Sequence, residues 1–556
     1  MADSIKVICD NLGGPIRVAM GTPLSDVAAQ LTPGRYPFLA AFVNNRIKEL
    51  NYKIYTPVTV RFVDITDFAG IRVYQRTSWF ILQKAARTLF PGHTLHIRHS
   101  MGQSGFYCEL EGLDEFTHEQ AAALEGHMRE VVAQNLPIER TKVLTSELRA
   151  IYAEQGFDDK TALLDTRPRL YSDLYTLDGT AGYFYGALAP STGYIDRFCI
   201  EPYYKGFYLA LPLRTNPGVL NKNVQQEKMF GIFQEYQSWV RIMGVPTVGD
   251  VNSKVLAGDA GGMIKLAEAF HERKFAWVAD TIYDANLSRG VRIVLISGPS
   301  SSGKTTSAKR LGIQLGVLGL KPVLISLDDY FVDREKTPKD ADGEYDYEAL
   351  EAIDLELFND HLRRLMRGES VDIPRYNFIT GRRMQHNDPL TLDERSILIV
   401  EGIHGLNPRL TPGVPEEQKF RIYISCFTSV AMDNLSRIAT TDNRLLRRIV
   451  RDHKYRGVSA VETIRRWPSV RRGEEKWIFP YQENADAMFN SSLLFEVAVL
   501  KEYALELLKR VPHDVPEYGE AWRLMRFLEP FAPIEPYMIP PTSLLREFVG
   551  GSSFSY

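Results

Sequence analysis

Short hydrophobic runs alternate with polar residues along the first 65 residues, and this pattern predicts a small unit of strands and one helix. TPLSDVAAQL predicts the helix, because Thr and Ser suit a helix cap and apolar residues follow at helical spacing. Asn44 and Asn45 predict a turn, since asparagine tolerates positive φ. The predicted elements are strands at 5–9, 16–20 and 58–65, a helix within 22–31, and a strand with its turn within 38–50.

The pattern changes in the C-terminal half. Apolar residues three and four positions apart over 263–285 predict an amphipathic helix, with His271 and its paired charges on a solvated face. From Val511 the chain is rich in proline and is predicted to wrap as extended chain. Nearly continuous apolar runs predict buried strands, as in a parallel sheet, at 291–296, 321–326, 396–401 and 420–427.

The first of these strands leads into the loop GPSSSGKT, which satisfies G-x-x-x-x-G-K-[ST]. Glycines let backbone N–H groups turn inward around phosphate oxygens, and the N-terminus of the following helix adds a positive dipole. Lys304 can reach the β- and γ-phosphates, and the Thr305 hydroxyl can ligate Mg²⁺. A chance match in a Gly-rich loop is the alternative, but the flanking strand and helix oppose it. The predicted nucleotide-binding residues are Gly298, Pro299, Ser300, Ser301, Ser302, Gly303, Lys304, Thr305 and Thr306.

Composition narrows the class of protein. With 556 residues the chain has room for about three domains, and its net charge of −3 provides no global basic field for nucleic acid. The four cysteines form no CxxC pair, so isolated thiols in a reducing compartment are expected. The N-terminus lacks a signal-peptide pattern and no apolar run reaches about 18 residues, which predicts a cytoplasmic protein without a membrane span.

Acidic residues follow two of the predicted strands, at the sheet edge where functional groups gather in α/β proteins. Asp328 and Asp329 follow the strand at 321–326, where a carboxylate can accept a hydroxyl proton or meet Mg²⁺. Capping of a turn is the alternative for both. Glu401 ends the strand at 396–401 and is predicted near Mg²⁺ or its water shell.

A later segment, NRLLRRIVRDHKYRG, is dense in arginine. A nucleic-acid patch and a solvated face are two interpretations. A third is a lid that closes on phosphates, which suits planar guanidinium groups. The arginines are Arg444, Arg447, Arg448, Arg451 and Arg456.

Over residues 290–500 the ordered motifs GPSSSGKTT, LDDYFVDR, EYDYEALEAID, VDIPRYNFITGRR, VEGIHGL and RRIVRDHKYRG resemble the uridine kinase/phosphoribulokinase family. The resemblance implies a P-loop kinase with a parallel sheet flanked by helices, using ATP, with GTP as an alternative donor, and Mg²⁺. It implies catalytic roles for Asp328 (general base), Lys304, Arg448 and Arg451. It further implies substrate binding by Asp346, Tyr330, Tyr376 and Phe378, nucleotide binding by Arg456, and Mg²⁺ binding by Thr305 and Glu401.

Two positions depart from the uridine–cytidine kinase pattern. Gly381 stands where a histidine reads the pyrimidine edge, and Val458 stands where an arginine contacts the nucleoside. The following stretch is unusually basic, with Arg465, Arg466, Arg471, Arg472 and Lys476. Extra cations would suit an acceptor that already carries phosphate or carboxylate, and a pyrimidine held differently is the other interpretation.

The N-terminal half resembles threonyl-tRNA synthetases. AFVNNRIKEL and the strand after it are similar to a TGS domain, a ubiquitin-like α+β module, and residues 77–165 are similar to the second, editing-related α+β domain. The HxxxH pair of that domain corresponds here to Thr77 and Ile81, which cannot ligate zinc, and 181–200 contains no Cys-x-x-x-His element. Editing chemistry is therefore predicted to be lost.

Three histidines in PGHTLHIRHS, at positions i, i+3 and i+6, form the remaining candidate for metal binding. His93, His96 and His99 are expected at a turn and a strand edge, with a metal site as the alternative.

The sequence thus predicts an α/β multidomain kinase that transfers the γ-phosphoryl group to a small-molecule hydroxyl, with the 5′-OH of a nucleoside as the favoured acceptor. The alternatives are a kinase of another hydroxylated or anionic metabolite and an RNA- or ribosome-associated regulator in which the TGS region binds RNA. A homo-oligomer is expected. The expected domains are 1–66 (TGS-like), 67–250 (synthetase-like), 251–288 (connecting helix), 289–510 (P-loop kinase-like) and 511–556 (Pro-rich extension).

Overall fold

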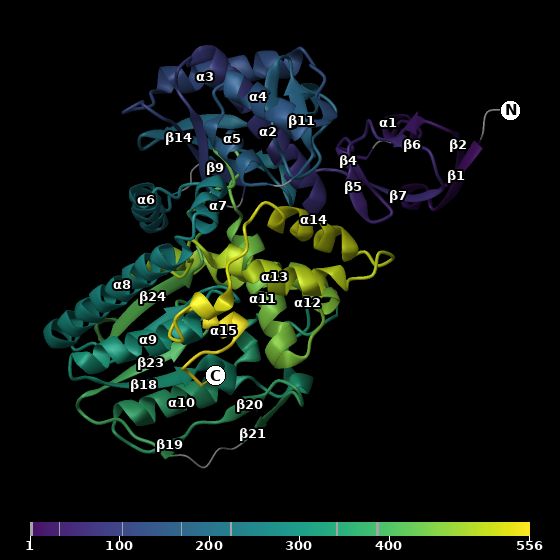
Figure 1. Ribbon diagram of the computed structural model, residues 1–556. Helices are drawn as coiled ribbons and strands as arrows, with labels where there is room; N and C mark the ends of the chain where they lie inside the picture. The colour runs from purple at the N-terminus through teal and green to yellow at the C-terminus, as the bar shows by residue number, and fades with distance from the viewer. Residues whose placement is uncertain are drawn as a thin grey trace.

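The computed structural model describes residues 4–32, 34–102, 104–167, 169–222, 225–340, 343–384 and 389–555. A small N-terminal unit, a second α+β unit and a larger C-terminal unit are distinct in the ribbon (Figure 1). The fold class predicted from the sequence, an α/β multidomain chain with a parallel C-terminal sheet, is confirmed.

The N-terminal unit is a five-stranded sheet in the order β2-β1-β7-β4-β5, accompanied by a short helix. β1 and β7 pair in parallel, and the other neighbours are antiparallel. Asn44 and Asn45 have φ values of 46° and 61° in the turn between β4 and β5, as the sequence predicts. The elements are β1 (Ser4–Cys9), β2 (Gly14–Ala19), β3 (Thr22–Pro23), α1 (Leu24–Ala28), β4 (Ala40–Val43), β5 (Arg46–Lys48), β6 (Lys53–Ile54) and β7 (Val58–Val63).

The second unit contains a four-stranded antiparallel sheet, β13-β14-β9-β8, and a three-stranded sheet, β10-β11-β12. The Asp67 side chain caps α2 by accepting a hydrogen bond from the Ala69 amide, and Thr117 with Gln120 forms a capping box at α3. The elements are α2 (Phe68–Leu89), β8 (Leu95–Met101), β9 (Gly105–Leu110), α3 (His118–Ala133), β10 (Glu139–Leu144), α4 (Thr145–Glu154), α5 (Asp158–Asp165), β11 (Tyr171–Leu177), β12 (Thr180–Gly182), β13 (Cys199–Tyr203), β14 (Gly206–Ala210), β15 (Pro212–Leu213) and β16 (Asn216–Leu220).

Three helices lead into the C-terminal unit: α6 (Glu227–Ile242), α7 (Val248–Leu256) and α8 (Ala260–Arg289). The prediction that His271 lies on a solvated face of this last helix is wrong, since the side chain is only 1% exposed. It packs against Phe489, and burial lowers the pKa of His271 to about 3. Its Nε2 lies 3.1 Å from the Ser492 carbonyl oxygen, so the imidazole has a structural role.

The C-terminal sheet is parallel throughout, in the order β18-β23-β17-β24-β25. Side chains of β17 alternate between two cores, with Ile293 and Leu295 packed toward α10, and Val294 and Ile296 toward α8 and α9. The elements are β17 (Ile293–Ser297), α9 (Lys304–Val317), β18 (Lys321–Ser326), α10 (Leu355–Met366), β19 (Val371–Asp372), β20 (Arg375–Asn377), β21 (Arg382–Met384), β22 (Pro389–Leu390), β23 (Ser396–Glu401), β24 (Lys419–Ser425), α11 (Thr440–Arg456), α12 (Ala460–Trp477), β25 (Ala487–Asn490) and α13 (Glu496–Lys509).

The C-terminal extension departs from its predicted extended form. It contains the helices α14 (Tyr518–Leu528) and α15 (Arg546–Val549), and Leu524 and Leu528 have no exposed surface. Apolar residues three and four apart in this segment provide the reason, because burial of that face outweighs the prolines on either side. One large core includes residues of α4, α8, α11, α13 and both of these helices.

Helix α14 lies between the second unit and the C-terminal unit (Figure 1). Arg72 of α2 donates to Glu520 at 2.8 Å, and Arg523 donates both to Glu520 and, at 2.7 Å, to Asp442 of α11. Burial acts to raise the pKa of Glu520, but Arg523 and Arg72 outweigh it and hold that pKa well below the usual range. Arg46 of the N-terminal unit lies over the Trp522 ring at 4.2 Å. One helix therefore contacts all three units.

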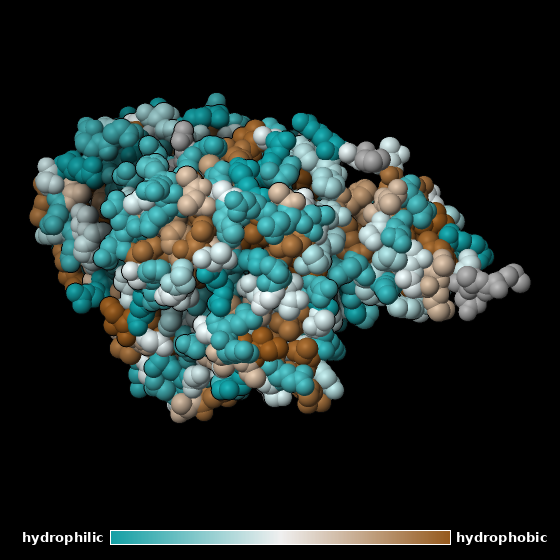
Figure 2. All heavy atoms as spheres, turned by 90° about the horizontal axis from the view of Figure 1, so that it is seen from above, coloured by the Kyte–Doolittle hydropathy of each residue, from teal (hydrophilic) through white to brown (hydrophobic). Residues whose placement is uncertain are grey.

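The N-terminal unit protrudes from the rest of the molecule when seen from above, and on this face hydrophobic residues are interspersed with hydrophilic ones (Figure 2). Among the described residues, no helix is both long and apolar enough to cross a membrane.

Replacing the cation of the α14 network is expected to destabilise the fold. Arg523→Met keeps an apolar stem but leaves Asp442 and Glu520 without their shared partner. The variant should lose about 3 kcal/mol of the free energy of unfolding, measured by urea denaturation. Because the folded pKa of Glu520 is depressed, this stabilisation is present above the unfolded glutamate pKa of about 4.3 and is lost as the pH falls. The difference from wild type should therefore shrink at acid pH.

Arg510→Met is the matched control, because Arg510 and its partner Glu506 are 60% and 67% exposed. It should cost at most about 1 kcal/mol. Equal costs for the two variants would contradict the importance of the α14 network.

Candidate functional site

The loop between β17 and α9 has the backbone geometry of an anion cradle. Ser301 and Gly303 have φ values of 59° and 84°, so successive amides turn toward the N-terminus of α9. A side chain at position 298 is excluded, because a Cβ on Gly298 would lie 1.9 Å from the Ile424 carbonyl oxygen. The predicted loop residues are thus brought together around one helix N-terminus.

Lys304 folds back over this loop. Its Nζ donates to the Gly298 carbonyl at 2.9 Å and to the Pro299 carbonyl at 3.2 Å. Burial lowers the pKa of Lys304, while the nearby carboxylates of Glu401 and Asp328 act in the opposite direction. The lysine thus lies near acidic groups and donates hydrogen bonds to backbone carbonyl oxygens. A phosphate oxygen can accept these hydrogen bonds in place of the carbonyls.

Oxygen atoms converge beside the loop in a way that fits Mg²⁺. Thr305 Oγ1 donates to Glu401 Oε1 at 3.2 Å, and Ser326 Oγ donates to the same oxygen at 3.0 Å. Burial raises the pKa of Glu401 to about 7, and Asp328 adds to this effect. Hydroxyl and carboxylate ligands are those that Mg²⁺ accepts alongside phosphates. Ser326 was missed in the sequence, although it ends the strand that precedes the two aspartates.

The two adjacent aspartates differ in their surroundings. Asp328 is half-buried at the end of β18, and its backbone N–H donates to Ser326 Oγ at 3.3 Å. Asp329 instead accepts a hydrogen bond from the Tyr376 amide at 3.4 Å and pairs with Arg375 at 3.3 Å. Asp329 therefore ties β20 to the turn that follows β18.

Four aromatic rings gather beyond these carboxylates. Phe331 and Tyr376 have ring centroids 5.5 Å apart, Tyr376 and Phe378 are 5.1 Å apart, and Tyr347 packs against Phe331 at 6.4 Å. Phe378 is 45% exposed, so the cluster is open to solvent.

Tyr330 lies apart from this aromatic cluster. It has no exposed surface, and its hydroxyl lies 3.1 Å from His361 Nδ1. Its ring packs edge-on against Phe358 in the core. Of the predicted substrate-binding residues, Tyr330 is the one that contributes no surface to the site.

A second acid, Glu348, accompanies Asp346 and was missed in the sequence. The Glu348 amide donates to Asp346 Oδ1 at 3.1 Å. Glu348 Oε2 is buried and has no hydrogen-bond partner among the described residues. Burial raises the pKa of Glu348. The nearby charges of Arg448 and Lys304 act to lower this pKa, and the charge of Asp328 acts to raise it. The available signal was the repetition of acids in EYDYEALEAID.

Two arginines of α11 are fully buried and hold the loop from behind. Arg444 pairs with Glu474 and donates to the Ser300 carbonyl at 2.8 Å. Arg447 pairs with Glu496 and donates to the Ser301 carbonyl at 3.4 Å. These side chains position the loop backbone and point away from solvent.

The other arginines of α11 surround Asp452. Arg448, Arg451 and Arg456 lie 3.2, 3.0 and 3.5 Å from its carboxylate oxygens. Arg448 also donates to Ser300 Oγ at 2.9 Å, and Arg456 lies over the Phe378 ring at 5.3 Å. Arg451 and burial together lower the pKa of Arg456 to about 10. These guanidinium groups therefore lie between the loop that joins β17 to α9, called the phosphate loop below, and the aromatic cluster.

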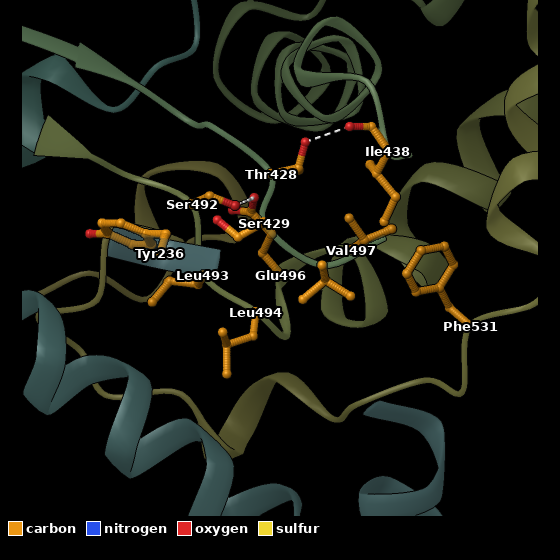
Figure 3. Close-up of a pocket in the computed structure, with 11 residues that line it drawn as sticks. Tyr236, Thr428, Ser429, Ile438, Ser492, Leu493, Leu494, Glu496, Val497 and Phe531 are labelled. Carbon is orange, nitrogen blue, oxygen red and sulfur yellow. Dashed lines mark hydrogen bonds between the residues drawn. The ribbon is translucent and has the colours of Figure 1, made fainter. Parts of the chain in front are cut away.

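A cavity of about 20 Å³ is lined in part by Glu496 (Figure 3). Thr428 Oγ1 donates to the Ile438 carbonyl at its rim, and Leu493, Val497 and Phe531 provide apolar walls. A cavity of this size has room for about one water molecule. The nucleotide loop and the aromatic cluster lie outside it.

The two positions that depart from the family pattern have structural partners. Gly381 has a φ of 70° in the turn between β20 and β21, and a Cβ there would lie 2.5 Å from Arg334 Nε. Arg334 occupies the space beside this turn and donates to the Phe378 carbonyl at 2.8 Å. The Val458 amide donates to the Asp452 carbonyl at 3.1 Å, just beyond α11.

The basic stretch of α12 is largely neutralised. Arg465 pairs with Glu517 at 2.7 Å, Arg471 with Glu474 at 2.8 Å and Arg472 with Asp340 at 3.1 Å. Lys476 lies over the Trp477 ring at 4.5 Å. Three of the five predicted cations, Arg465, Arg471 and Arg472, therefore already have carboxylate partners.

In the second unit, the residues at the HxxxH positions are part of the core. Thr77 Oγ1 donates to the Val73 carbonyl at 2.8 Å and accepts from the Ala189 amide at 2.9 Å, and Ile81 has no exposed surface. Both side chains are therefore packed in the core of this unit.

The three histidines near β8 have separate environments. His96 Nε2 lies 2.9 Å from Glu111, His93 Nδ1 lies 2.8 Å from the Glu111 carbonyl, and His99 stacks on Phe233. Within the described ranges, no group of three His, Cys, Asp or Glu side chains is arranged to hold a metal ion.

Comparisons with known proteins find two different classes of relative for this chain. Residues 293–497 match the model of the Phosphoribulokinase / Uridine kinase family. The chain is 32% identical over 198 residues to a uridine kinase of Schizosaccharomyces pombe, covering 35% of this chain and 38% of that one. It is 28% identical over 214 residues to a uridine kinase of Staphylococcus aureus, covering 38% of this chain and 93% of that one.

The N-terminal region is similar to a different class of protein. The chain is 28% identical over 203 residues to threonine–tRNA ligase 1 of Bacillus subtilis, covering 36% of this chain and 31% of that one. The match thus spans about a third of the length of the ligase and of the fission yeast kinase. The chain carries a P-loop kinase domain of the Phosphoribulokinase / Uridine kinase family, fused to an N-terminal region similar to threonine–tRNA ligases.

Proposed function

We propose that this chain transfers the γ-phosphoryl group of ATP to the 5′-OH of a nucleoside. The observation that carries the proposal is the aromatic cluster of Phe331, Tyr347, Tyr376 and Phe378, beside carboxylates and across from the phosphate loop. Aromatic rings offer stacking surfaces to a base, and carboxylates accept hydrogen bonds from sugar hydroxyls. The aromatic cluster and the carboxylates together fit the two halves of a nucleoside.

In this proposal each charged group has a distinct task. Asp328 accepts the proton of the attacking hydroxyl, while Asp346 and Glu348 hold the sugar hydroxyls. Lys304 and the amides of the loop bind the β- and γ-phosphates, and Arg448, Arg451 and Arg456 stabilise the charge that develops during transfer. Thr305 and Glu401 would hold Mg²⁺, which neutralises phosphate charge when bound.

The charge of the acceptor end favours a neutral acceptor over an anionic one. Burial raises the pKa of Glu348, and the nearby carboxylates of Asp328 and Asp346 add to this effect, whereas Arg448 and Lys304 oppose it. An acceptor with its own phosphate or carboxylate would be repelled by these groups. The basic stretch of α12 does not offset this, because Arg465, Arg471 and Arg472 already have carboxylate partners.

A substrate panel tests the acceptor class. Nucleosides, nucleoside monophosphates and sugar alcohols would each be incubated with ATP and Mg²⁺, and ADP formation and the phosphorylated product would be measured. Nucleosides should give a kcat/KM at least about 100-fold above that of the corresponding monophosphates, since one added dianion faces three carboxylates. A preference for an anionic or purely aliphatic acceptor would contradict the proposal.

The general base is tested by a pair of neighbouring variants. Asp328→Asn should lower kcat by about 10² to 10⁴ with little change in the KM for ATP, because only proton acceptance is lost. Asp329→Asn is the matched control, since its amide oxygen can still accept the Tyr376 hydrogen bond. It should retain kcat within about tenfold. Near-normal turnover by Asp328→Asn would remove Asp328 from its assigned role.

A further inference from the structure

The C-terminal segment 536–555 reaches the phosphate loop and places a carboxylate there. Glu547 of α15 accepts hydrogen bonds from the hydroxyl of Thr306 at 2.6 Å and from its backbone N–H at 3.3 Å. Glu547 is only 9% exposed, and Thr306 has no exposed surface. The carboxylate also acts on the charges of Lys304 and Glu401.

The group that Glu547 contacts belongs to the nucleotide loop. Thr306 is the third residue of α9, so its amide belongs to the N–H groups at the N-terminus of this helix. In a P-loop such amides cradle the α- and β-phosphates, and a helix N-terminus favours any anion placed against it. A carboxylate at Thr306 therefore occupies a position suited to a phosphate oxygen.

The segment is fixed on both sides of this contact. Leu544 lies 3.4 Å from the position of a Cβ on Gly303, and the guanidinium of Arg447 lies 5.0 Å from the Phe548 ring. Lys454, near the end of α11, donates to the Val549 carbonyl at 2.6 Å. Lys309 of α9 donates to the Ser555 carbonyl. The segment thus crosses from the start of the loop helix to the end of the arginine-rich helix.

We propose that Glu547 is an internal competitor of the donor nucleotide, and that segment 536–555 moves away from Thr306 when a nucleotide triphosphate binds. The Glu547 carboxylate and a phosphate oxygen would accept hydrogen bonds from the same N–H and hydroxyl of Thr306, and both are negatively charged. Binding must therefore break the Glu547–Thr306 contact. This inference rests on the loop binding nucleotide and is independent of the identity of the acceptor.

The first test measures Mg·ATP binding to the full chain by calorimetry, without acceptor. Glu547→Gln keeps the size and hydrogen-bonding oxygen of the side chain but removes its charge, so Mg·ATP should bind at least about tenfold more tightly. Glu535→Gln is the matched control, because Glu535 is exposed in the loop just before this segment, and its affinity should equal that of wild type. Unchanged or weaker binding by folded Glu547→Gln overturns the proposal.

The second test uses the wild-type chain and needs no substitution. Hydrogen exchange of residues 543–550 should become faster when Mg·ATP is added, while the P-loop residues become more protected. An unchanged or slower exchange of 543–550 in the ATP-bound protein overturns the proposal.

The outcomes separate this inference from the proposed function. Absence of ATP binding to both wild type and Glu547→Gln would overturn the nucleotide site and this inference together. Tight ATP binding that is strengthened by Glu547→Gln, without transfer to any nucleoside, would support this inference and overturn only the proposed acceptor.

Discussion

Two buried ion pairs, Arg444 with Glu474 and Arg447 with Glu496, are the interaction on which the site depends. Burying such pairs costs desolvation free energy, so their net stabilisation is small compared with the cost of breaking one of them. Their main effect is to fix the relative positions of the elements that they join. Each arginine also holds a carbonyl of the phosphate loop, so α11, α12, α13 and the loop are fixed relative to one another. The loop amides can be preorganised for an anion only because the arginines secure the opposite side of the backbone.

The same constraint joins the phosphate end of the site to the acceptor end through adjacent residues of α12. Glu474 neutralises Arg444 behind the loop, whereas Gly473 allows Glu348 to approach so closely that a Cβ would lie 2.3 Å from its Cβ. A shift of α12 would therefore disturb both ends at once. The acceptor end differs in composition from the phosphate end, since it combines the carboxylates of Asp346 and Glu348 with aromatic rings. Under the proposed function, this difference separates a donor polyphosphate from a neutral hydroxyl acceptor.

Local sequence signals predicted the loop between β17 and α9 and most strands, because a loop motif and a buried parallel strand are encoded by neighbouring residues. The signals failed where the structure depends on distant partners. Glu547 lies 241 positions from Thr306, and no local pattern announces such a pairing. His271 looked polar on its helix, yet the sheet packs over it through Phe489. The prolines of the C-terminal extension predict extended chain, whereas the apolar spacing of α14 favours the helix that the structure contains.

Helix α11 connects the site to the rest of the chain. Asp442, in its first turn, holds Arg523 of α14, and the arginines of its later turns hold the phosphate loop and Asp452. Both sets of contacts lie on one continuous helix of 17 residues. Because a helix has a fixed rise and rotation per residue, the positions of its first and later turns are rigidly related. Since α14 also contacts Arg72 and Arg46 of the two N-terminal units, any movement of those units relative to α14 acts on the first turn of α11. The N-terminal region is thereby mechanically joined to the arginines of the site, although it contributes no side chain to the phosphate loop contacts described above.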